Sequence, residues 1–439
     1  MKKLLTLKDN SKHAILDDEL VHLDDMVALS KPTISELHDD DHPNLLIFPQ
    51  DFNTWGDDIG EQHLFDIESR QIVTGNIMGF VGFRDTKISI SSRFTQDDGQ
   101  DYFLHYMLQK VLAINLFDLK FNSDEQSIFD FLIYLFPAYL KRAMRQGVYK
   151  EYQTHKYNDA NIRGRIDVTR HIRSNTPFTG RIAYSTREYA TDNNVTQLIR
   201  HTIEYISTHK YGKYILHQDQ EIIDAVKDIR DATPSYIQQD RQYIVSKNLR
   251  SASHPFFVEY RPLQRLCLQI LRHEELKFGR ENQEVYGILF DGAWLWEEYL
   301  NTFLHPILLH PRNKTKENPL YLFNPRAGKC YPDFYNQERG IVLDAKYKGY
   351  SDWGKVQNAD IFQVIAYMHI IDANIGGFLV PSHKQPLPPR TLNGSRSEMM
   401  HILGLPVDTH IESYSEYYQY MELQENILYS KINSIILNS

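Results

Sequence analysis

The sequence predicts an α+β protein with two differently built parts. Short runs of alternating apolar and polar residues between positions 67 and 94 indicate strands, and segments of helical period follow from residue 102. A second apolar run, residues 341–343, lies between turn-forming residues and a further helical segment. We therefore expect a small antiparallel β unit plus a helical region in the N-terminal part, and an α/β domain in the C-terminal part.

The composition is that of a folded protein with several domains. The chain has 439 residues, of which 42% are hydrophobic and 12% aromatic, enough for two or three domains. Its formal net charge is −9 at pH 7. Because proteins that hold DNA by charge alone are usually basic, any contact with nucleic acid must be local or supplied by a partner.

Three further features predict a soluble, cytoplasmic protein. The two cysteines, Cys267 and Cys330, are far apart and form neither a disulfide framework nor a thiolate metal cluster, which suits a reducing compartment. The first residues have no apolar core of signal-peptide length. The most apolar run, residues 128–140, is interrupted by Asp130 and Pro137 and is too short to span a membrane.

Changes of pattern along the chain predict three regions. Residues 1–60 are acidic and irregular, residues 61–269 hold the β unit followed by helices, and residues 270–439 hold the α/β domain. Gly79 and Gly82 lie within a strand pattern and indicate a bulge or a close approach of two backbones. Helical period extends over residues 102–112, 127–144, 194–209 and 414–437, and over residues 213–273 with a break at Thr233 and Pro234.

Residues 141–173 reverse the charge balance of the chain. Nine lysines and arginines face three acidic residues there, which favours an anionic partner, although a plain solvated surface fits the charge equally well. Within this segment, residues 161–170 have the pattern of a turn, a strand and the start of a helix.

The stretch from residue 331 to residue 348 is predicted to form a β-hairpin with an acidic site. Side chains alternate along a strand, so Asp344 and Lys346 share a face, and Asp333 at the start of the partner strand can converge on Asp344. Two carboxylates beside an ammonium suit a hard cation such as Mg²⁺ and the hydrolysis of a phosphodiester. A solvated strand edge is the alternative, but an aspartate and a lysine directly after an apolar run are costly to bury unless they are paired.

Helices on both sides of the hairpin add polar groups to the predicted site. Upstream, Glu297 lies on a helical stretch from which an acidic side chain can face the hairpin, and its neighbour Glu298 leaves the choice open by one residue. Downstream, Gln363 and Tyr367 are four residues apart and share one helical face.

One motif in the same region imitates a phosphate-binding loop. Residues 349–355 fit the pattern Gly-x-x-x-x-Gly-Lys. The next residue, Val356, lacks the hydroxyl that would bind Mg²⁺, and Asp352 would place a negative charge in the phosphate cradle. We therefore expect this chain not to hydrolyse a nucleotide itself.

Taken in order, these motifs resemble the McrC family, the nuclease subunits of McrBC-type restriction systems. The resemblance covers roughly residues 70–380. It rests on Ile-Ser-Ile-Ser-Ser-Arg-Phe at 88–94, Arg-Gly-Arg-Ile-Asp-Val at 163–168, Arg-Glu-Tyr-Ala-Thr-Asp-Asn-Asn at 187–194, Leu-Trp-Glu-Glu-Tyr-Leu at 295–300, Tyr-Pro-Asp-Phe at 331–334 and Leu-Asp-Ala-Lys-Tyr-Lys at 343–348. The last two motifs are the most specific and match the PD-(D/E)xK nuclease superfamily in the branch that includes RecB-type enzymes.

The resemblance implies a function and a partner. It implies a type IV, modification-dependent system in antiviral defence, in which a separate McrB-like AAA+ GTPase hexamer recognises double-stranded DNA, often 5-methylcytosine-containing. The chain would dock on that hexamer through its N-terminal half, stimulate GTP hydrolysis and cut the DNA with Mg²⁺. By motif, Asp333 and Asp344 would be metal ligands, Lys346 the catalytic lysine, Glu297 a supporting acid and metal ligand, and Gln363 a further site residue.

Two other functions stay in competition with this interpretation. One is a non-catalytic GTPase activator with a vestigial nuclease core, against which the presence of Asp333, Asp344 and Lys346 argues. The other is a stand-alone RecB-like repair nuclease, which the acidic charge and the long N-terminal half disfavour. Trp296 also departs from the family, where phenylalanine is expected, and residues 141–173 can contact either DNA or the GTPase.

Overall fold

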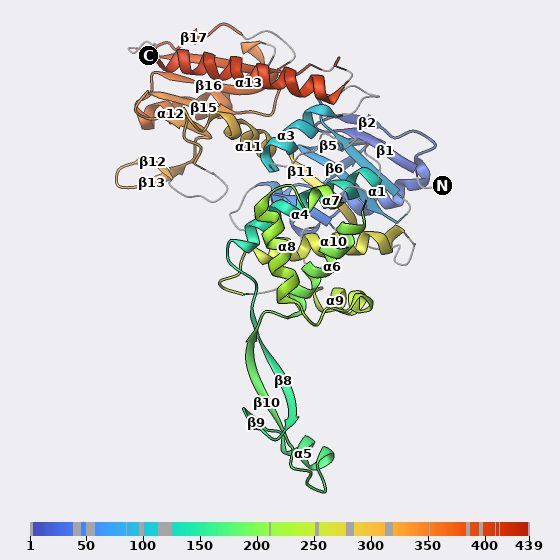
Figure 1. The fold of residues 1–439 in the computed structure, drawn as a ribbon. Helices are drawn as coiled ribbons and strands as arrows, with labels where there is room; N and C mark the ends of the chain where they lie inside the picture. Colours follow the sequence, from blue (N-terminus) through green and yellow to red (C-terminus); the bar gives the residue numbers. More distant parts are fainter. Residues whose placement is uncertain are drawn as a thin grey trace. The chain divides into compact units, whose positions relative to one another are not determined.

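The computed structural model describes most of the chain and divides it into two compact units (Figure 1). The described residues are 3–37, 45–49, 58–84, 86–95, 101–112, 125–209, 212–250, 254–277, 285–311, 319–350, 352–382, 387–394, 398–408, 410–411 and 413–437. Unit 1 combines residues 1–131 with residues 281–439, and unit 2 comprises residues 132–280. The α+β class predicted from the sequence is confirmed.

The N-terminal part of unit 1 is built on a mixed five-stranded sheet in the order β1-β7-β6-β11-β3. The strands are β1 (Lys3–Lys8), β3 (Leu45–Phe48), β6 (Ile77–Phe83), β7 (Thr86–Ser91) and β11 (Tyr286–Asp291). β6 runs antiparallel to β7 and β11, whereas the outer pairs β1–β7 and β11–β3 are parallel. The predicted antiparallel unit is therefore only part of a larger sheet, because β1, β3 and β11 join it from distant parts of the chain.

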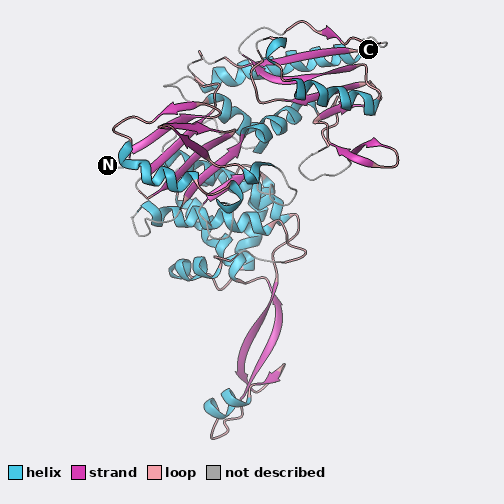
Figure 2. Ribbon diagram, turned by 180° about the vertical axis from the view of Figure 1, so that it is seen from behind, coloured by secondary structure: helices cyan, strands magenta, loops and turns pink. Residues whose placement is uncertain are grey.

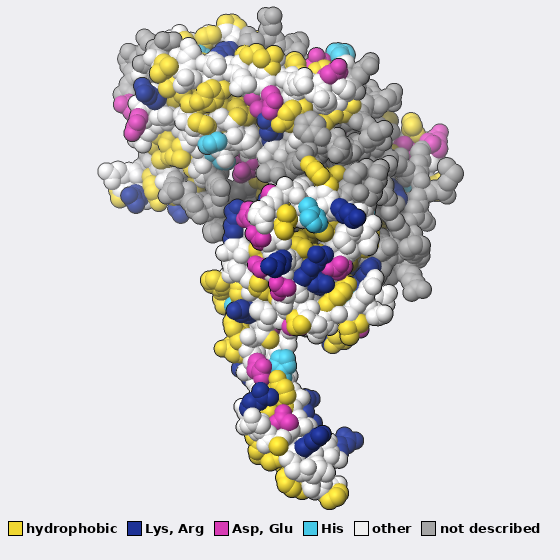
Figure 3. All heavy atoms as spheres, viewed as in Figure 1, with side chains coloured by type: hydrophobic (Ala, Val, Ile, Leu, Met, Phe, Trp, Pro, Cys, Tyr) yellow, Lys and Arg dark blue, Asp and Glu magenta, His cyan; other side chains and the backbone are white. Residues whose placement is uncertain are grey.

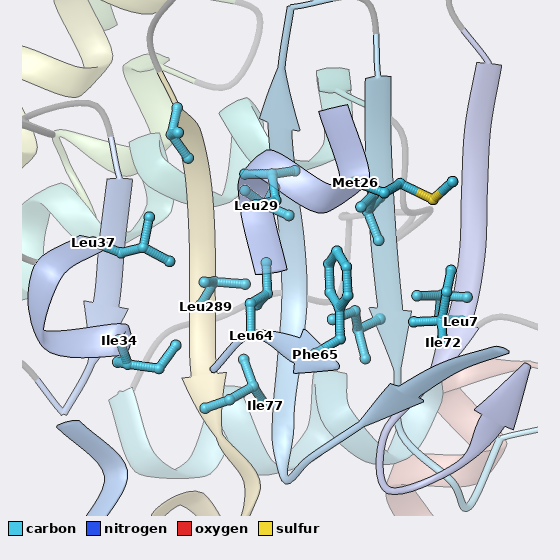
Figure 4. Packing of buried hydrophobic residues seen from close by; sticks show 14 of the residues in the cluster. Leu7, Met26, Leu29, Ile34, Leu37, Leu64, Phe65, Ile72, Ile77 and Leu289 are labelled. Atoms are coloured by element: carbon cyan, nitrogen blue, oxygen red, sulfur yellow. The ribbon is translucent and has the colours of Figure 1, made fainter. Parts of the chain in front are cut away.

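A three-stranded antiparallel sheet and short helices cover one side of this core. The sheet has the order β2-β5-β4, with β2 (Lys12–Ala14), β4 (Phe65–Glu68) and β5 (Gln71–Thr74), and the helices are α1 (Leu23–Ser30) and α2 (Ile34–Leu37). Figure 4 shows Met26 and Leu29 of α1 pointing toward the same apolar cluster as Phe65 and Leu289.

The prediction that residues 1–60 are irregular is wrong for the described part of that segment. Residues 45–48 form a continuous apolar run and become the buried strand β3. Leu7, Met26 and Leu29, in contrast, are scattered among polar and acidic residues, so no local run reveals their burial. They are buried only because β7, β4 and β11 supply their partners. Residues 58–61 form a turn of 3₁₀ helix.

The boundaries predicted at residues 60 and 269 differ from those of the two units, which lie at residues 131 and 280. β11, which lies after residue 270, is inserted between β6 and β3 of the N-terminal sheet. The close approach predicted at Gly79 is confirmed: a Cβ there would lie 2.1 Å from the Ile288 carbonyl oxygen. Backbone pairing therefore makes the N-terminal and C-terminal segments one compact unit.

The C-terminal part of unit 1 is the predicted α/β domain. Its sheet has the order β14-β15-β16-β18-β17, in which β15, β16 and β18 are parallel and the two outer strands are antiparallel. The strands are β14 (Phe334–Asn336), β15 (Ile341–Ala345), β16 (Ile375–Ser382), β17 (Arg390–Thr391) and β18 (Met399–Pro406). The helices are α3 (Tyr102–Leu112), α11 (Gly292–Leu304), α12 (Asn358–Ile371) and α13 (Tyr414–Leu437).

Burial explains how the helices cover this sheet. Every residue of β15 and β16 is buried, as expected for central parallel strands covered on both faces. α12 packs over the face that holds Val342 and Phe378, where Val364 and Met368 complete the apolar cluster. Trp296 of α11 donates its indole N–H to the Leu379 carbonyl oxygen at 3.1 Å.

Unit 2 consists of helices and a long two-stranded arm (Figures 1 and 2). The helices are the C-terminal part of α4 (Glu125–Met144), then α6 (Asn194–Thr208), α7 (Gly212–Ile215), α8 (Gln220–Ala232), α9 (Arg241–Lys247) and α10 (Tyr260–Lys277). Asn193 caps α6 and Asp219 caps α8, each by accepting backbone N–H groups. These helices confirm the predicted helical periods, including the break after residue 232.

The arm, residues 151–190, was not predicted as a hairpin. It pairs β8 (Glu151–Asp159) with β10 (Ile182–Ala190) and carries β9 (Arg165–Ile166) and α5 (Val168–Ser174) between them. β8 has no apolar face, and its residues alternate only between half-buried and exposed, so hydrophobic periodicity could not reveal it. The predicted strand and helix start within residues 161–170 are confirmed.

The arm contains most of the basic segment that the sequence singled out. Figure 3 shows lysine and arginine side chains along it and hydrophobic side chains toward its tip, where Ile166, Val168, Ile172 and Phe178 are exposed. Five of the nine cations of residues 141–173 form ion pairs with acidic residues: Lys141, Arg142, Arg145, Arg163 and Arg170. No helix in the described ranges is long and apolar enough to cross a membrane.

Candidate active site

A tight hairpin brings the two predicted aspartates together. Phe334 of β14 pairs with Leu343 of β15, which sets Asp333 opposite Asp344 at the end of the ladder. The Ala345 N–H donates to Asp333 Oδ2 at 2.8 Å and holds that carboxylate at the end of β15. Gly340, with φ of 58°, closes the turn in the left-handed region that glycine adopts readily.

Lys346, the first residue after β15, completes the cluster. Its Nζ lies 2.8 Å from Asp344 Oδ2 and 3.4 Å from Asp360 Oδ1. It also donates a hydrogen bond to Gln363 Oε1 at 3.1 Å. Gln363 is oriented in turn, because its Nε2 donates to the Tyr367 hydroxyl at 2.9 Å.

Burial dominates the electrostatics of the two aspartates. The side chains of Asp333 and Asp344 are 9% and 2% exposed. Loss of hydration and the nearby Asp333 charge raise the pKa of Asp344, Lys346 opposes both effects, and the net pKa is about 8. Burial likewise raises the pKa of Asp333, against the hydrogen bond from Ala345 and the charge of Lys346.

Lys346 responds in the opposite sense. Burial disfavours its ammonium form, but the surrounding carboxylates Asp344, Asp360 and Asp333 outweigh that cost and raise its pKa above the usual value. The side chain is therefore a cation at neutral pH. Such a group stabilises negative charge rather than accepting a proton.

Asp360 belongs to the cluster, although the sequence analysis did not select it. It is 8% exposed, accepts a hydrogen bond from the Tyr350 hydroxyl at 2.8 Å and lies 3.5 Å from Lys348 Nζ. Burial raises its pKa, but the hydrogen bond from Tyr350 and the charges of Lys346 and Lys348 reverse this, so the net shift is downward. Helical spacing could have revealed it, since Asp360 lies one turn before Gln363 on α12.

His310 is a second residue that the sequence analysis missed. Its Nδ1 lies 2.7 Å from the Asp333 carbonyl oxygen, and its ring stacks on Phe334 with centroids 4.8 Å apart. Its Nε2 lies 3.8 Å from Glu298 Oε1. Since His310 is separated from the site by more than twenty residues and lies outside any motif, only the fold could identify it.

The acidic helix of the sequence prediction is α11, which Asp291 caps by accepting the Ala293 and Trp294 N–H groups. Glu298 reaches the site through His310 and thus through the backbone of Asp333. Glu297 is half-buried on the same helix. Its role as an acid and metal ligand stays a prediction.

The donor atoms of the cluster fit a hard cation. Both aspartates offer carboxylate oxygens. Asp344 Oδ2 forms an ion pair with Lys346 Nζ at 2.8 Å but has no donor aligned with it for a hydrogen bond. A dication would favour the charged form of two carboxylates that burial otherwise disfavours. Within the described ranges no three acidic, histidine or cysteine side chains group closely enough to enclose a metal. Mg²⁺ itself usually binds one or two carboxylates and keeps several waters.

The loop after the hairpin is no phosphate-binding loop in its described residues. Residues 353–355 form a turn of 3₁₀ helix rather than the start of an α-helix. Asp352 accepts the Gly354 N–H at 2.6 Å, which places a carboxylate on a backbone donor that a phosphate would need.

The fold and the site together define an α+β protein in which a buried carboxylate and lysine cluster lies on a hairpin of a mixed sheet. A family model described as McrBC 5-methylcytosine restriction system component matches residues 72–381, and the chain belongs to that family. The resemblance proposed from the sequence, including its extent, is confirmed. No curated protein matches the sequence.

Two solved structures from Thermococcus gammatolerans are similar to this chain. One is a half-complex from a tetradecameric assembly of McrB AAA+ hexamers with bound McrC, at 15% identity and a TM-score of 0.51, covering 97% of this chain and 100% of that chain. The other is a cryo-EM structure of the McrBC complex, at 14% identity and a TM-score of 0.31, covering 69% of this chain and 87% of that chain. At 15% identity the first likeness shows a similar fold alone, and the second, with a TM-score of 0.31, does not support even a similarity of fold.

Proposed function

We propose that this chain is the nuclease subunit of an McrBC-type restriction system and cuts double-stranded DNA in an Mg²⁺-dependent reaction of the PD-(D/E)xK type. The observation that carries the proposal is the buried cluster of Asp333, Asp344 and Lys346 on one hairpin. An aspartate pair that burial makes costly, with a lysine 2.8 Å from one carboxylate, has a chemical use in phosphodiester hydrolysis but little structural benefit.

Each residue has a role that follows from its contacts. Asp333 and Asp344 would hold the cation, which supplies polarisation of the scissile phosphate and of an attacking water. Lys346, kept charged by its acidic neighbours, would stabilise the negative charge that develops on the phosphate. Gln363 and Asp360 fix the direction of the lysine, and His310 fixes the backbone of Asp333.

The proposal includes a McrB-like AAA+ GTPase hexamer as partner. It is supported by family membership and by a similar fold in a complex of McrB AAA+ hexamers with bound McrC. The absence of a functional phosphate loop at residues 352–356 fits a division of labour in which the partner hydrolyses GTP. Docking would use unit 2, whose arm carries the cations Lys156, Arg165 and Arg173 on an otherwise acidic chain.

A cleavage assay tests the proposal directly. Duplex DNA with and without 5-methylcytosine is incubated with Mg²⁺ and the full chain, alone and with the GTPase and GTP. We expect cuts only in the complete mixture, and a loss of at least about 10²-fold for Asp344→Ala with GTPase stimulation unchanged. Glu338→Ala, which removes an exposed carboxylate from the same hairpin, is the matched control.

Two outcomes would contradict this assignment. Cleavage that survives in Asp344→Ala would refute the site. If the wild type and Asp344→Ala both stimulate GTP turnover but the wild type cleaves neither DNA, the result would instead favour an activator with a silent nuclease core.

A further inference from the structure

A second hairpin lies next to the candidate active site. It consists of β12 (Leu320–Phe323) and β13 (Ala327–Cys330), paired antiparallel with Tyr321 opposite Lys329 and Phe323 opposite Ala327. At its base Leu320 and Cys330 pack into the apolar cluster under α12. Figures 1 and 2 both show the rest of the hairpin projecting away from the sheet of the α/β domain.

The exposed part of this hairpin is cationic. Residues 319–330 contain Arg326 and Lys329 and no acidic residue, in a chain whose net charge is −9. Both side chains are exposed. The guanidinium of Arg326 lies 5.4 Å from the centre of the Tyr321 ring, which holds it on the hairpin without neutralising its charge.

Apolar side chains lie beside these cations. Phe323 is 65% exposed and Leu322 is 43% exposed, at the turn end of β12. Phe323 shares a face of the hairpin with Tyr321 and Lys329, because strand side chains alternate, so its exposed ring lies on the cationic face. Proteins contact duplex DNA with cations that reach phosphates and with apolar side chains that lie against sugars or between base steps.

Chain connectivity places this surface within reach of a bound duplex. β13 ends at Cys330, and Asp333 follows three residues later. The four residues of β13 and this link span at most roughly 23 Å at about 3.3 Å per residue. That length is shorter than one turn of B-DNA, about 34 Å. The hairpin therefore lies within the length of one DNA turn from a scissile phosphate at Asp333.

We propose that the β12–β13 hairpin is a DNA-contacting ribbon that holds the duplex beside the scissile phosphate. Arg326 and Lys329 bind phosphates of the backbone, and Phe323 lies against sugars and base edges in the groove. The inference rests on the proposed nuclease function and names the surface that presents the substrate to Asp333, Asp344 and Lys346.

Duplex binding without cleavage tests this role. The full chain is titrated into a short fluorescent duplex in EDTA, over a range of salt concentrations. We expect the double variant R326A/K329A to bind about tenfold more weakly at low salt. The slope of log affinity against log salt should shrink by roughly 2, because about 0.9 is lost for each phosphate contact. Phe323→Ala should weaken binding several-fold with the slope unchanged.

The matched control is K12A/R70A, which removes two exposed cations from the β2–β5–β4 sheet of the same unit. We expect its affinity and its salt slope to stay within twofold of the wild type. A wild-type chain that binds no duplex, or an R326A/K329A variant with wild-type affinity and slope, overturns the proposal. An R326A/K329A variant that binds DNA normally but no longer stimulates the GTPase also overturns the proposal, since the hairpin would then contact a protein partner.

These outcomes separate the hairpin from the active site. If the wild type never cuts DNA but R326A/K329A loses duplex binding, the hairpin assignment stands and the nuclease proposal fails. If the wild type cuts DNA and R326A/K329A binds and cuts it equally well, the nuclease proposal stands and the hairpin assignment fails.

Discussion

Asp344 combines a high free-energy cost of burial with a proposed role as a metal ligand. It follows three apolar residues on a fully buried strand, and its carboxylate lies between Asp333 and Lys346. A neutral or apolar side chain would be easier to bury there. A carboxylate at this position is explained if its charged form binds the proposed cation, because that cation and Lys346 would then offset its negative charge.

The pKa of Asp344 leads to a prediction about stability and pH. Its folded value of about 8 lies above the usual 3.8, so the group favours folding below about pH 4, and this contribution is lost as the pH rises toward 8. Without metal, we expect Asp344→Asn to be more stable than the wild type at pH 8, by a few kcal/mol as an order of magnitude. The difference should shrink toward pH 4.

Urea unfolding in EDTA at several pH values measures this difference. Glu338→Gln changes an exposed carboxylate of the same hairpin and should show no comparable pH dependence. A stability difference between Asp344→Asn and the wild type that is equal at pH 4 and pH 8 would contradict the raised pKa.

Gln363 permits a prediction that separates orientation from charge. Gln363→Leu removes the acceptor for Lys346, but the lysine keeps its ion pairs with Asp344 and Asp360. We therefore expect a moderate loss of cleavage, about tenfold, compared with the larger loss in Asp344→Ala. Tyr367→Phe removes only the outer hydrogen bond and should lose less, and single-turnover cleavage rates test this order.

At the scale of elements, the close packing of β16 is what holds the sheet of the α/β domain together. Gly376 faces Met368 and Val364 of α12, and Gly377 pairs with His401 of β18. Both glycines let neighbouring elements approach more closely than any side chain would allow. The ends of β15 and β16, and with them the site, depend on this spacing.

Replacement of Gly377 tests the packing. A Cβ there would lie 2.4 Å from the His401 carbonyl oxygen, which is backbone and cannot move aside without breaking the strand pair. We expect Gly377→Ala to destabilise the protein by about 2 kcal/mol or more, seen as a lower melting temperature. Gly394→Ala, which meets nothing within 4 Å, is the control, and equal melting of the two variants would contradict the packing argument.

At the scale of the whole of unit 1, a polar network connects the segment after β15 to the N-terminal sheet. Arg93 donates to buried Asp9 and to Asn76, and its guanidinium lies 4.8 Å from the centre of the Tyr347 ring. Tyr347, next to Lys346, shares a hydrogen bond with Ser92 at 3.1 Å. The position of Lys346 therefore depends on residues from the first hundred of the chain.

This network predicts that the C-terminal region does not fold by itself. A fragment of residues 270–439 would lack β6 and β3, between which β11 is paired, and would leave Tyr347 without Ser92. We expect no cooperative thermal transition for that fragment by circular dichroism. Co-expression of residues 1–131 with residues 281–439 should restore one, and a cooperative transition of the fragment alone would contradict the division into units.

Neighbouring residues along the chain were enough to predict the local elements of the hairpin and the shared face of its polar groups. Residues 341–343 predicted a buried strand, turn residues predicted the hairpin, and two-residue alternation predicted that Asp344 and Lys346 share a face, all of which the structure shows. These features depend on neighbours along the chain, so local periodicity is enough to predict them. The motif order also predicted the family correctly.

Contacts between distant residues depend on the three-dimensional fold and could not be predicted from local patterns. β11 enters the N-terminal sheet, and His310 and Glu298 reach the backbone of Asp333. The arm escaped prediction because β8 is polar on both faces. In each case the stabilising contact joins segments far apart in the chain, or buries no apolar face. Such contacts arise from packing and pairing in three dimensions and leave no period in the sequence.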